Sequence, residues 1–381
     1  MSVVGAVEIS VVLPCLNEEA AIGNCLKKIK DVFARENLAG EIIVADNGST
    51  DRSREIAHSE GARVVTEPDK GYGAACRRGL RETSGTYIVL ADADASYDFG
   101  EIPKFLKPLR EGFDLVLGSR LKGTIEKGAM SWPNRRLGNP ILSGIFRLFF
   151  RTKLSDIHCG MRAMTRDAYR KMRLRSSGME FASEMVVAAL ALKLEIAEVP
   201  IRYAKRLGRS KLTPLSDAWR HLKFMLLFCP LWLYLIPGLA GFMVSLAVLL
   251  LSLGGPFRFL GRTWDIHLTV FAGAILIVSF EMINLGVFAH LFAVTHGLQK
   301  RGRWTVFFER RFKIEKGLIL GAVIFLAGLA VNLFIFLEWF SSRFGALHRI
   351  RESILAMILL VLGLQIIFSS FFISHLLWNE K

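Results

Sequence analysis

Three long stretches without a charged residue constrain what this chain can fold into more than any other feature. Phe224–Phe257, Gly317–Leu337 and Ser353–Trp378 contain no Asp, Glu, Lys or Arg. About 20 apolar residues in a helix cross the hydrocarbon core of a bilayer, and Pro230 and Pro237 break the first stretch early. We therefore predict a membrane domain over residues 231–381. Its four transmembrane helices are expected at about 232–253, 267–294, 317–338 and 353–378; the second is an additional apolar stretch that contains one acid, Glu281.

The segment that precedes the first span mixes charged and apolar residues. Trp219, Arg220, His221 and Lys223 lie among apolar positions there, a composition typical of helices that lie in the plane of a membrane interface. We predict an interfacial amphipathic helix over 216–230. Residues 1–215 have the mixed composition of a soluble domain and are expected to fold separately.

The net charge of +15 indicates partners that carry negative charge. No nucleic-acid motif is recognisable, so anionic lipids and phosphate-bearing substrates explain the charge better than nucleic acid does. The loop His296–Lys316 between the second and third spans is the most basic of the loops. Because basic loops face the cytoplasm, we expect a multi-pass protein of the cell membrane with both termini and the soluble domain on the cytoplasmic side.

The soluble half alternates short apolar runs with helical periodicity. Such alternation predicts an α/β fold in which a mostly parallel sheet carries helices on both faces. The expected strands are Ile9–Leu13, Glu41–Ala45, Arg63–Thr66, Thr86–Ala91 and Asp114–Gly118. A Gly-x-Gly-x-x-Gly fingerprint after the first strand and a Walker A motif are both missing, which disfavours a dehydrogenase and a nucleotide-hydrolysing machine.

Two carboxylates directly follow the fourth expected strand. Asp92 and Asp94 are one residue apart, so strand periodicity aims them the same way. Such a pair suits Mg²⁺ or Mn²⁺ that also grips a diphosphate, although a lone Asp-x-Asp is more often a simple turn. Polar residues also follow two other strands. Asn17 and Glu18 follow the first strand, and Asp46 follows the second. Ligands of parallel sheets bind beyond the carboxyl ends of the strands, so three such clusters favour a nucleotide-sugar site over a turn.

Six blocks of sequence carry a family resemblance over roughly residues 8–215. The blocks are Val12–Glu19, Ala45–Asp51, Lys70–Gly73, Asp92–Asp94, Gly118–Arg120 and Arg206–Leu212. Together they resemble family 2 glycosyltransferases of the dolichyl-phosphate mannose synthase type. The resemblance implies a GT-A, Rossmann-like fold, a UDP- or GDP-linked sugar donor, Mg²⁺ or Mn²⁺ and a polyprenyl phosphate acceptor, dolichyl or undecaprenyl.

The resemblance also implies roles for individual residues, and some residues have more than one role. The donor nucleotide would be held by Pro14, Asn17, Glu18, Asp46 and Lys70, and the metal by Asp92, Asp94 and Ser96. The acceptor phosphate would be held by Arg120, Arg135, Asn139, Arg206 and Lys211, and Glu184 would contact the sugar. Asp92, Asp94, Arg120 and Arg135 would carry catalysis.

Three positions depart from the family pattern. Cys15 stands where an aromatic residue is usual, Asn47 where a second Asp is common, and Ser96 where a Gln often completes the metal shell. The base of the nucleotide, the sugar and the choice between Mg²⁺ and Mn²⁺ stay open.

The expected chemistry follows from charge. A polyprenyl phosphate is already an anion at neutral pH, so its oxygen can attack the anomeric carbon without a strong base, in one displacement with inversion. Two alternatives stay open: a processive polysaccharide synthase, and a non-catalytic module for transport or assembly of lipid-linked sugars. The sequence also leaves open the oligomeric state, a homo-oligomer included.

Two further residues are ambiguous in the sequence. Glu281 in the second span is either a functional acid or a partner within the helix bundle. For His158 we favour a hydrogen-bonded structural histidine over a proton carrier.

Overall fold

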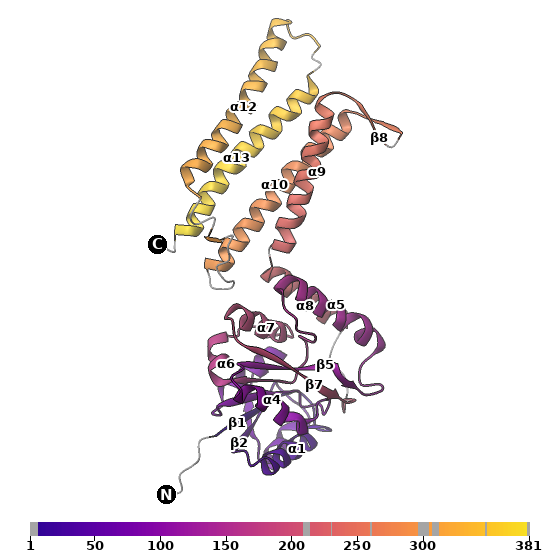
Figure 1. The fold of residues 1–381 in the computed structure, drawn as a ribbon, viewed down its shortest axis with the longest axis vertical. Helices are drawn as coiled ribbons and strands as arrows, with labels where there is room; N and C mark the ends of the chain where they lie inside the picture. The colour runs from indigo at the N-terminus through magenta and orange to yellow at the C-terminus, as the bar shows by residue number, and fades with distance from the viewer. Residues whose placement is uncertain are drawn as a thin grey trace. The chain divides into compact units, whose positions relative to one another are not determined.

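The structure is a computed structural model that describes residues 7–208, 214–229, 231–259, 261–295, 305–306, 312–346 and 349–378. The chain forms two compact units, Met1–Met225 and Leu226–Lys381. Figure 1 shows the first as an α/β domain and the second as a set of long helices.

The first unit is built on a seven-stranded sheet of order β3-β2-β1-β4-β6-β5-β7. The strands are β1 (Ile9–Cys15), β2 (Gly40–Asp46), β3 (Arg63–Thr66), β4 (Tyr87–Leu90), β5 (Leu115–Ile125), β6 (Arg162–Thr165) and β7 (Ile196–Tyr203). All neighbouring pairs are parallel except the two that involve β6. The predicted mostly parallel sheet is confirmed, while β6 and β7 are additional strands.

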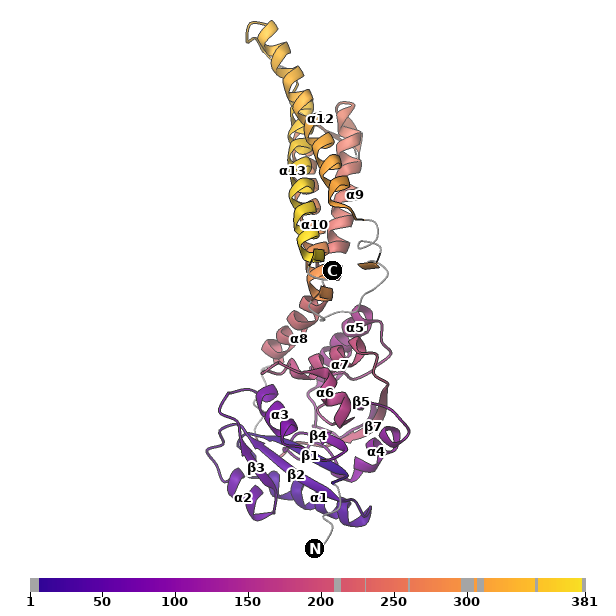
Figure 2. The ribbon, with the colours of Figure 1, turned by 90° about the vertical axis from the view of Figure 1, so that its left-hand side faces the viewer.

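Helices cover both faces of this sheet, as Figure 2 shows. The helices of this part of the chain are α1 (Ile22–Arg35), α2 (Ser53–Ser59), α3 (Tyr72–Arg81), η1 (Phe99–Glu101), α4 (Ile102–Arg110), η2 (Asn134–Gly138), α5 (Asn139–Phe150), α6 (Arg166–Met172), α7 (Phe181–Ala191) and α8 (Pro214–Phe228), not all of which touch the sheet. Apolar residues of α1 recur every three to four positions, so one stripe of the helix faces the core. Ile22, Leu26 and Ile29 of that stripe are fully buried.

The register of the central strands places their carboxyl ends together. Cys15, the last residue of β1, pairs with Asp46, the last residue of β2. On the other side of β1, Val12 pairs with Leu90, the last residue of β4. The loops that follow these three strands therefore leave the same edge of the sheet.

The second unit contains the long apolar helices. Its elements are η3 (Leu231–Leu235), α9 (Ile236–Leu253), β8 (Phe257–Phe259), β9 (Arg262–Trp264), α10 (Ile266–Thr295), α12 (Ile314–Ser341) and α13 (Ile350–Trp378). Within the described ranges, four helices are long and apolar enough to cross a membrane: Trp232–Leu253, Ile266–Thr295, Ile314–Ser341 and Ile350–Leu377. The four expected membrane helices are present, and the last three begin before the predicted positions.

Small residues allow two of these helices to pack closely. A Cβ atom on Gly363 of α13 would lie 2.6 Å from the backbone nitrogen of Phe325 in α12, and one on Gly321 would lie 2.7 Å from Ile367. Close backbone approach at glycine is a usual way for helices to associate in lipid. Leu249 of α9, Leu276 of α10 and Ile358 of α13 form a buried apolar cluster elsewhere in the unit.

Candidate active site

The loops that follow β1 and β2 are tied to each other by hydrogen bonds. The backbone N–H of Asn17 donates to Ser49 Oγ at 2.9 Å, and the N–H of Thr50 donates to Asn17 Oδ1 at 2.8 Å. Asn17 adopts a left-handed backbone with φ of 50°, which asparagine tolerates better than most residues. Asp46 is fully buried and accepts the N–H groups of Gly48 and Ser49, each at 3.2 Å. Two of the three predicted polar clusters therefore meet.

The third cluster is the Asp-x-Asp after β4. Asp94 Oδ1 accepts both the N–H and the hydroxyl of Ser96, at 3.0 and 2.5 Å. Asp92 accepts the hydroxyl of Tyr72 at 2.9 Å. Burial, and then the nearby charge of Asp94, raises the pKa of the Asp92 carboxyl. The two carboxylates therefore lie close together in a poorly hydrated place.

A glycine makes room for Asp92. A Cβ atom at Gly160 would lie 2.6 Å from Asp92 Oδ2 and 2.9 Å from the hydroxyl oxygen of Tyr97. The N–H of Gly160 donates to that same Tyr97 oxygen at 2.8 Å. Neither Gly160 nor Tyr97 was among the residues predicted from the sequence, since both lie outside the six blocks that carry the family resemblance.

The donor set fits a divalent cation that is completed by substrate. Among the described residues no three His, Cys, Asp or Glu side chains converge as a metal cluster. Asp92 and Asp94 supply two carboxylates, with the Ser96 hydroxyl beside them. Mg²⁺ and similar ions are commonly held by one or two carboxylates plus substrate phosphates.

Arg206 joins the ends of β1 and β4. Its Nη2 lies 3.1 Å from Glu18 Oε1, and its Nη1 lies 3.6 Å from Asp94 Oδ2. The next residue, Leu207, donates its N–H to the backbone oxygen of Asp94 at 3.0 Å. The segment after β7 therefore runs across the candidate metal site. Lys211, predicted to act with Arg206, lies outside the described residues.

Arg120 at the end of the buried part of β5 forms a bidentate pair with Asp156. Nε lies 2.7 Å from Oδ2 and Nη2 lies 2.9 Å from Oδ1. The guanidinium also lies 5.3 Å from the ring centre of Tyr203. Arg120 is 8% exposed. Asp156 therefore orients the Arg120 guanidinium before any phosphate binds. A phosphate would be bound by the N–H groups of Arg120 that do not donate to Asp156.

The other two predicted phosphate-binding residues, Arg135 and Asn139, lie in η2 and at the start of α5. Arg135 is exposed in η2, and Asn139 begins α5, where its amide donates to Met130 Sδ at 3.3 Å. Within the described part of the chain, no hydrogen bond joins either residue to Asp92 or Asp94. The acceptor-binding roles of Arg135 and Asn139 stay predictions.

Two residues predicted to bind the donor nucleotide, Pro14 and Lys70, lie in β1 and in the loop before α3. Pro14 is buried in β1 and pairs with Ala45 of β2, next to Asp46. Lys70 is exposed in the loop before α3. That loop is held by Asn47, whose Oδ1 accepts the N–H of Gly71 at 2.7 Å. Asn47, a departure from the family pattern, therefore ties the end of β2 to the Lys70 loop.

Glu184, predicted to contact the sugar, has close partners in the protein. Its two carboxylate oxygens accept the N–H groups of Arg175 and Ser176, both at 2.8 Å. These bonds hold the 173–178 loop against α7. The loop in turn packs closely on the start of α3, because a Cβ on Gly73 would lie 2.5 Å from the backbone oxygen of Ser176. The contact between Glu184 and sugar stays a prediction.

His158 lacks the hydrogen bond that the sequence analysis assigned to it. Both ring nitrogens are buried and have no hydrogen-bond partner among the described residues. The ring packs edge-on against His221, with centroids 4.2 Å apart. Burial, and then the proximity of His221, holds the pKa of His158 well below its usual value, so the ring is neutral at pH 7. The prediction of a hydrogen-bonded histidine is wrong, because the buried ring packs against a second imidazole and neither of its nitrogens meets a donor or acceptor among the described residues.

Family models match both units of the chain. Residues 10–173 match the model described as glycosyl transferase family 2, and residues 287–377 match glycosyltransferase family 2 C-terminal transmembrane region.

Curated relatives extend this match over nearly the whole chain. The low-salt glycan biosynthesis hexosyltransferase Agl6 of Haloferax volcanii is 38% identical over 373 residues, which cover 97% of this chain and 89% of the relative. A dolichyl-phosphate hexose transferase of the same organism is 32% identical over 211 residues, 55% of this chain and 88% of the relative.

Among solved structures, the fold is similar to glucosyl-3-phosphoglycerate synthase from Mycobacterium tuberculosis in complex with Mn²⁺, UDP and glucosyl-3-phosphoglycerate. That match has 26% identity and a TM-score of 0.47, and covers 58% of this chain and 80% of the synthase. The predicted fold class is confirmed by the sheet together with the family match. The relationship to Agl6 extends through the soluble and membrane units alike, so the chain belongs to glycosyltransferase family 2 and is a multi-pass membrane enzyme of that family.

Proposed function

We propose that this enzyme transfers a single hexose from a nucleotide-diphospho-sugar to a polyprenyl phosphate at the cytoplasmic face of the membrane, with inversion at the anomeric carbon. The observation that carries the proposal is the meeting of Asp92, Asp94 and Arg206 at the carboxyl edge of the sheet. Two carboxylates and a guanidinium are the groups that a metal-bound diphosphate requires. The printed names of the relatives, a hexosyltransferase and a dolichyl-phosphate hexose transferase, support the sugar class and the acceptor.

The donor would lie along the ends of β1, β2 and β4. Asn17 would lie at the nucleoside end, where the buried Asp46 holds the loop after β2 and the two loops are tied together. Asp92 and Asp94 lie at the diphosphate end. A divalent cation held there would neutralise the charge that develops on the departing diphosphate.

The acceptor phosphate needs positive charge rather than a base. Its oxygen attacks the anomeric carbon, the bond from that carbon to the diphosphate breaks, and the electron pair leaves with the diphosphate. Arg120 and Arg206 would reduce the repulsion between the two anions. The bidentate hold of Asp156 on Arg120 fixes the guanidinium before substrate arrives, which limits the reorganisation needed in the transition state.

The cytoplasmic placement rests on charge. The basic segment 296–316, much of which lies outside the described residues, would face the cytoplasm by the positive-inside rule. With four spans, both termini and the catalytic domain would then lie where nucleotide sugars are made.

Transfer by the full-length protein tests the proposal. The protein in nanodiscs is incubated with Mg²⁺ or Mn²⁺, a short polyprenyl phosphate and a panel of radiolabelled UDP- and GDP-sugars, and label entering the organic phase is counted. We expect one donor to give a lipid product that requires the metal and whose anomeric configuration, read by NMR, is opposite to that of the donor. A polymeric product, or no lipid product with any donor, would contradict the proposal.

Two variants control this assay. Asp94→Ala should abolish transfer and leave the melting temperature close to that of the parent. Asp31→Asn removes an exposed carboxylate from α1 and should change neither.

A further inference from the structure

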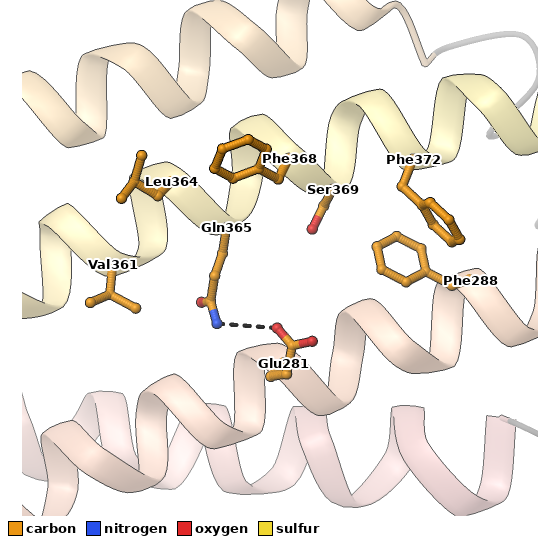
Figure 3. Close-up of a pocket in the computed structure, with 8 residues that line it drawn as sticks. All are labelled: Glu281, Phe288, Val361, Leu364, Gln365, Phe368, Ser369 and Phe372. Carbon is orange, nitrogen blue, oxygen red and sulfur yellow. Dashed lines mark hydrogen bonds between the residues drawn. The ribbon is translucent and has the colours of Figure 1, made fainter.

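A glutamate lies at mid-depth in the membrane unit and is exposed on its surface. Glu281 is halfway along the α10 span Ile266–Thr295, about 20 Å from either end at the rise of a helix. Gln365 of α13 donates to Glu281 Oε2 at 3.1 Å, as the dashed line in Figure 3 marks. Of the two roles left open by the sequence, the structure shows pairing within the bundle. That single bond leaves the carboxyl group on the outer face.

The pair opens onto a groove between α10 and α13. The groove has a volume of about 460 Å³ and is lined by Glu281, Gln365 and Ser369 among phenylalanine and aliphatic side chains. In Figure 3, Gln365 reaches from α13 toward Glu281, and Phe288 and Phe372 face each other at one end. Phe368 on the rim is 67% exposed.

The hydrogen-bond capacity of this cluster is only partly used. Gln365 Oε1 is buried and has no partner among the described residues. Gln365 has a second amide hydrogen, Glu281 has a second oxygen, and Ser369 carries a hydroxyl on the same groove. Hydrocarbon offers none of these groups a partner, so a surface of this kind is covered in the membrane by something that carries donors and acceptors.

We propose that the groove between α10 and α13 is the contact surface for a second copy of this chain. Copies inserted in the same orientation carry Glu281 and Gln365 at the same depth, so a two-fold axis along the membrane normal brings the two clusters face to face. The cluster holds both donors and acceptors and is therefore complementary to itself, as a two-fold interface requires.

Other occupants fit less well. An isoprenoid chain is apolar and leaves Glu281 and Gln365 Oε1 without partners. The four spans contain Lys or Arg only at Lys316 and Arg351, near their first residues, so the second copy brings amide and hydroxyl groups rather than a cation to this depth. The exposed Phe368 supplies an apolar contact beside the polar cluster.

Energy transfer between labelled copies in liposomes tests this contact. The full-length protein is labelled at Asp31→Cys on the soluble domain, since the five native cysteines are all buried. Transfer is then measured as the ratio of protein to lipid is raised. We expect association of the parent protein, weakened roughly tenfold by Glu281→Leu and by Gln365→Leu, because each interaction occurs twice in a two-fold interface.

A matched variant separates this effect from a general change of polarity. Asn332→Leu removes a polar side chain from α12, but Asn332 donates to the Gly328 oxygen of its own helix at 3.2 Å. We expect Asn332→Leu to associate as the parent does. The proposal would be overturned if the parent protein did not associate. It would also be overturned if Glu281→Leu, Gln365→Leu and Asn332→Leu associated equally.

Cross-linking keeps the polar cluster intact and does not depend on the stability of those variants. A cysteine at Phe368 on the groove rim should cross-link between copies through a short thiol reagent, whereas one at the exposed Val323 of α12 should not. The reverse pattern would place the contact on another face and refute the assignment. Neither experiment uses sugar transfer, so their outcome is independent of the proposed reaction.

Discussion

Arg120 donates three hydrogen bonds to the carboxylate of Asp156, two from the guanidinium and one from the backbone N–H. Nε and Nη2 donate at 2.7 and 2.9 Å, and the backbone N–H of Arg120 donates to Oδ2 at 3.1 Å. Asp156 is fully buried. Its own position is set by Glu198 of β7, which accepts the N–H of Asp156 at 3.0 Å. A buried charge pair of this geometry orients the guanidinium without help from substrate.

Asp156→Asn should therefore be strongly destabilising. It leaves the Arg120 charge buried without a counter-charge, and such a change typically costs about 3–5 kcal/mol. The loss should appear as a lower melting temperature of the detergent-solubilised protein. Glu126→Gln breaks the exposed pair between Glu126 and Arg202 and should leave the melting temperature nearly unchanged. Equal melting temperatures for the parent and Asp156→Asn would show that the buried pair contributes little.

Gly160→Ala should weaken metal-dependent donor binding while the fold persists. The added Cβ would lie 2.6 Å from Asp92 Oδ2, so the carboxylate must move. We expect the apparent affinity for Mn²⁺ with UDP to fall by roughly tenfold, the size of effect that supporting contacts of metal ligands have. Calorimetry on the full-length protein measures it. Gly144→Ala is the control, since its Cβ would meet nothing nearer than 3.8 Å; similar losses in both variants would exclude the steric explanation.

Metal binding should be linked to the release of a proton from Asp92. Burial and Asp94 raise the pKa of Asp92 in the folded protein. Between the ordinary pKa of an aspartate and this raised value, the folded protein binds more protons than the unfolded chain, so the stability of the metal-free protein falls as pH rises. A cation requires the ionised carboxylate, so its affinity should rise over the same window by up to about tenfold per pH unit.

Calorimetry in two buffers of different ionisation enthalpy measures the released proton. Asp92→Asn should abolish the release, although it also weakens binding. Proton release that persists unchanged in Asp92→Asn would assign the titration to another group.

Arg206→Ala should reduce sugar transfer more than Arg202→Ala, a matched change on β7, the strand that precedes Arg206. Arg206 contacts both Glu18 and Asp94, and a charged hydrogen bond of this kind contributes about 1.5–3 kcal/mol. We expect kcat/KM to fall by roughly 10- to 100-fold, with Arg206→Lys retaining part of the activity. Arg202→Ala, which breaks only the exposed contact with Glu126, should change kcat/KM little. Separate KM values for donor and acceptor would show which substrate Arg206 serves.

Much of the architecture could be predicted from sequence because it follows from local patterns. Long apolar runs predict the four membrane helices, and alternation of strands and helices predicts a mostly parallel sheet. In a parallel sheet the carboxyl ends of the strands share an edge, so the proximity of Asn17, Asp46 and Asp92 also follows from the order of the elements.

Other features depend on contacts between residues far apart in the chain. β6 is four residues long and enters the sheet antiparallel between β4 and β5, which no local period encodes. Arg120 looks like an anion-binding residue in the sequence, yet 36 positions later Asp156 supplies the carboxylate that it contacts. Glu184 looks like a substrate ligand, yet loop folding brings two backbone N–H groups to it.

The sequence by itself determined which segments are apolar enough to cross the membrane, the first five strands of the sheet and which carboxylates follow them, because hydropathy and periodicity act along the chain. Only the tertiary structure decided which charges pair, that Gly160 borders Asp92, and that Gln365 reaches Glu281 across two helices. The physical reason is that a hydrogen bond or an ion pair depends on angstrom-scale distances, and packing sets those distances between elements that are remote in sequence.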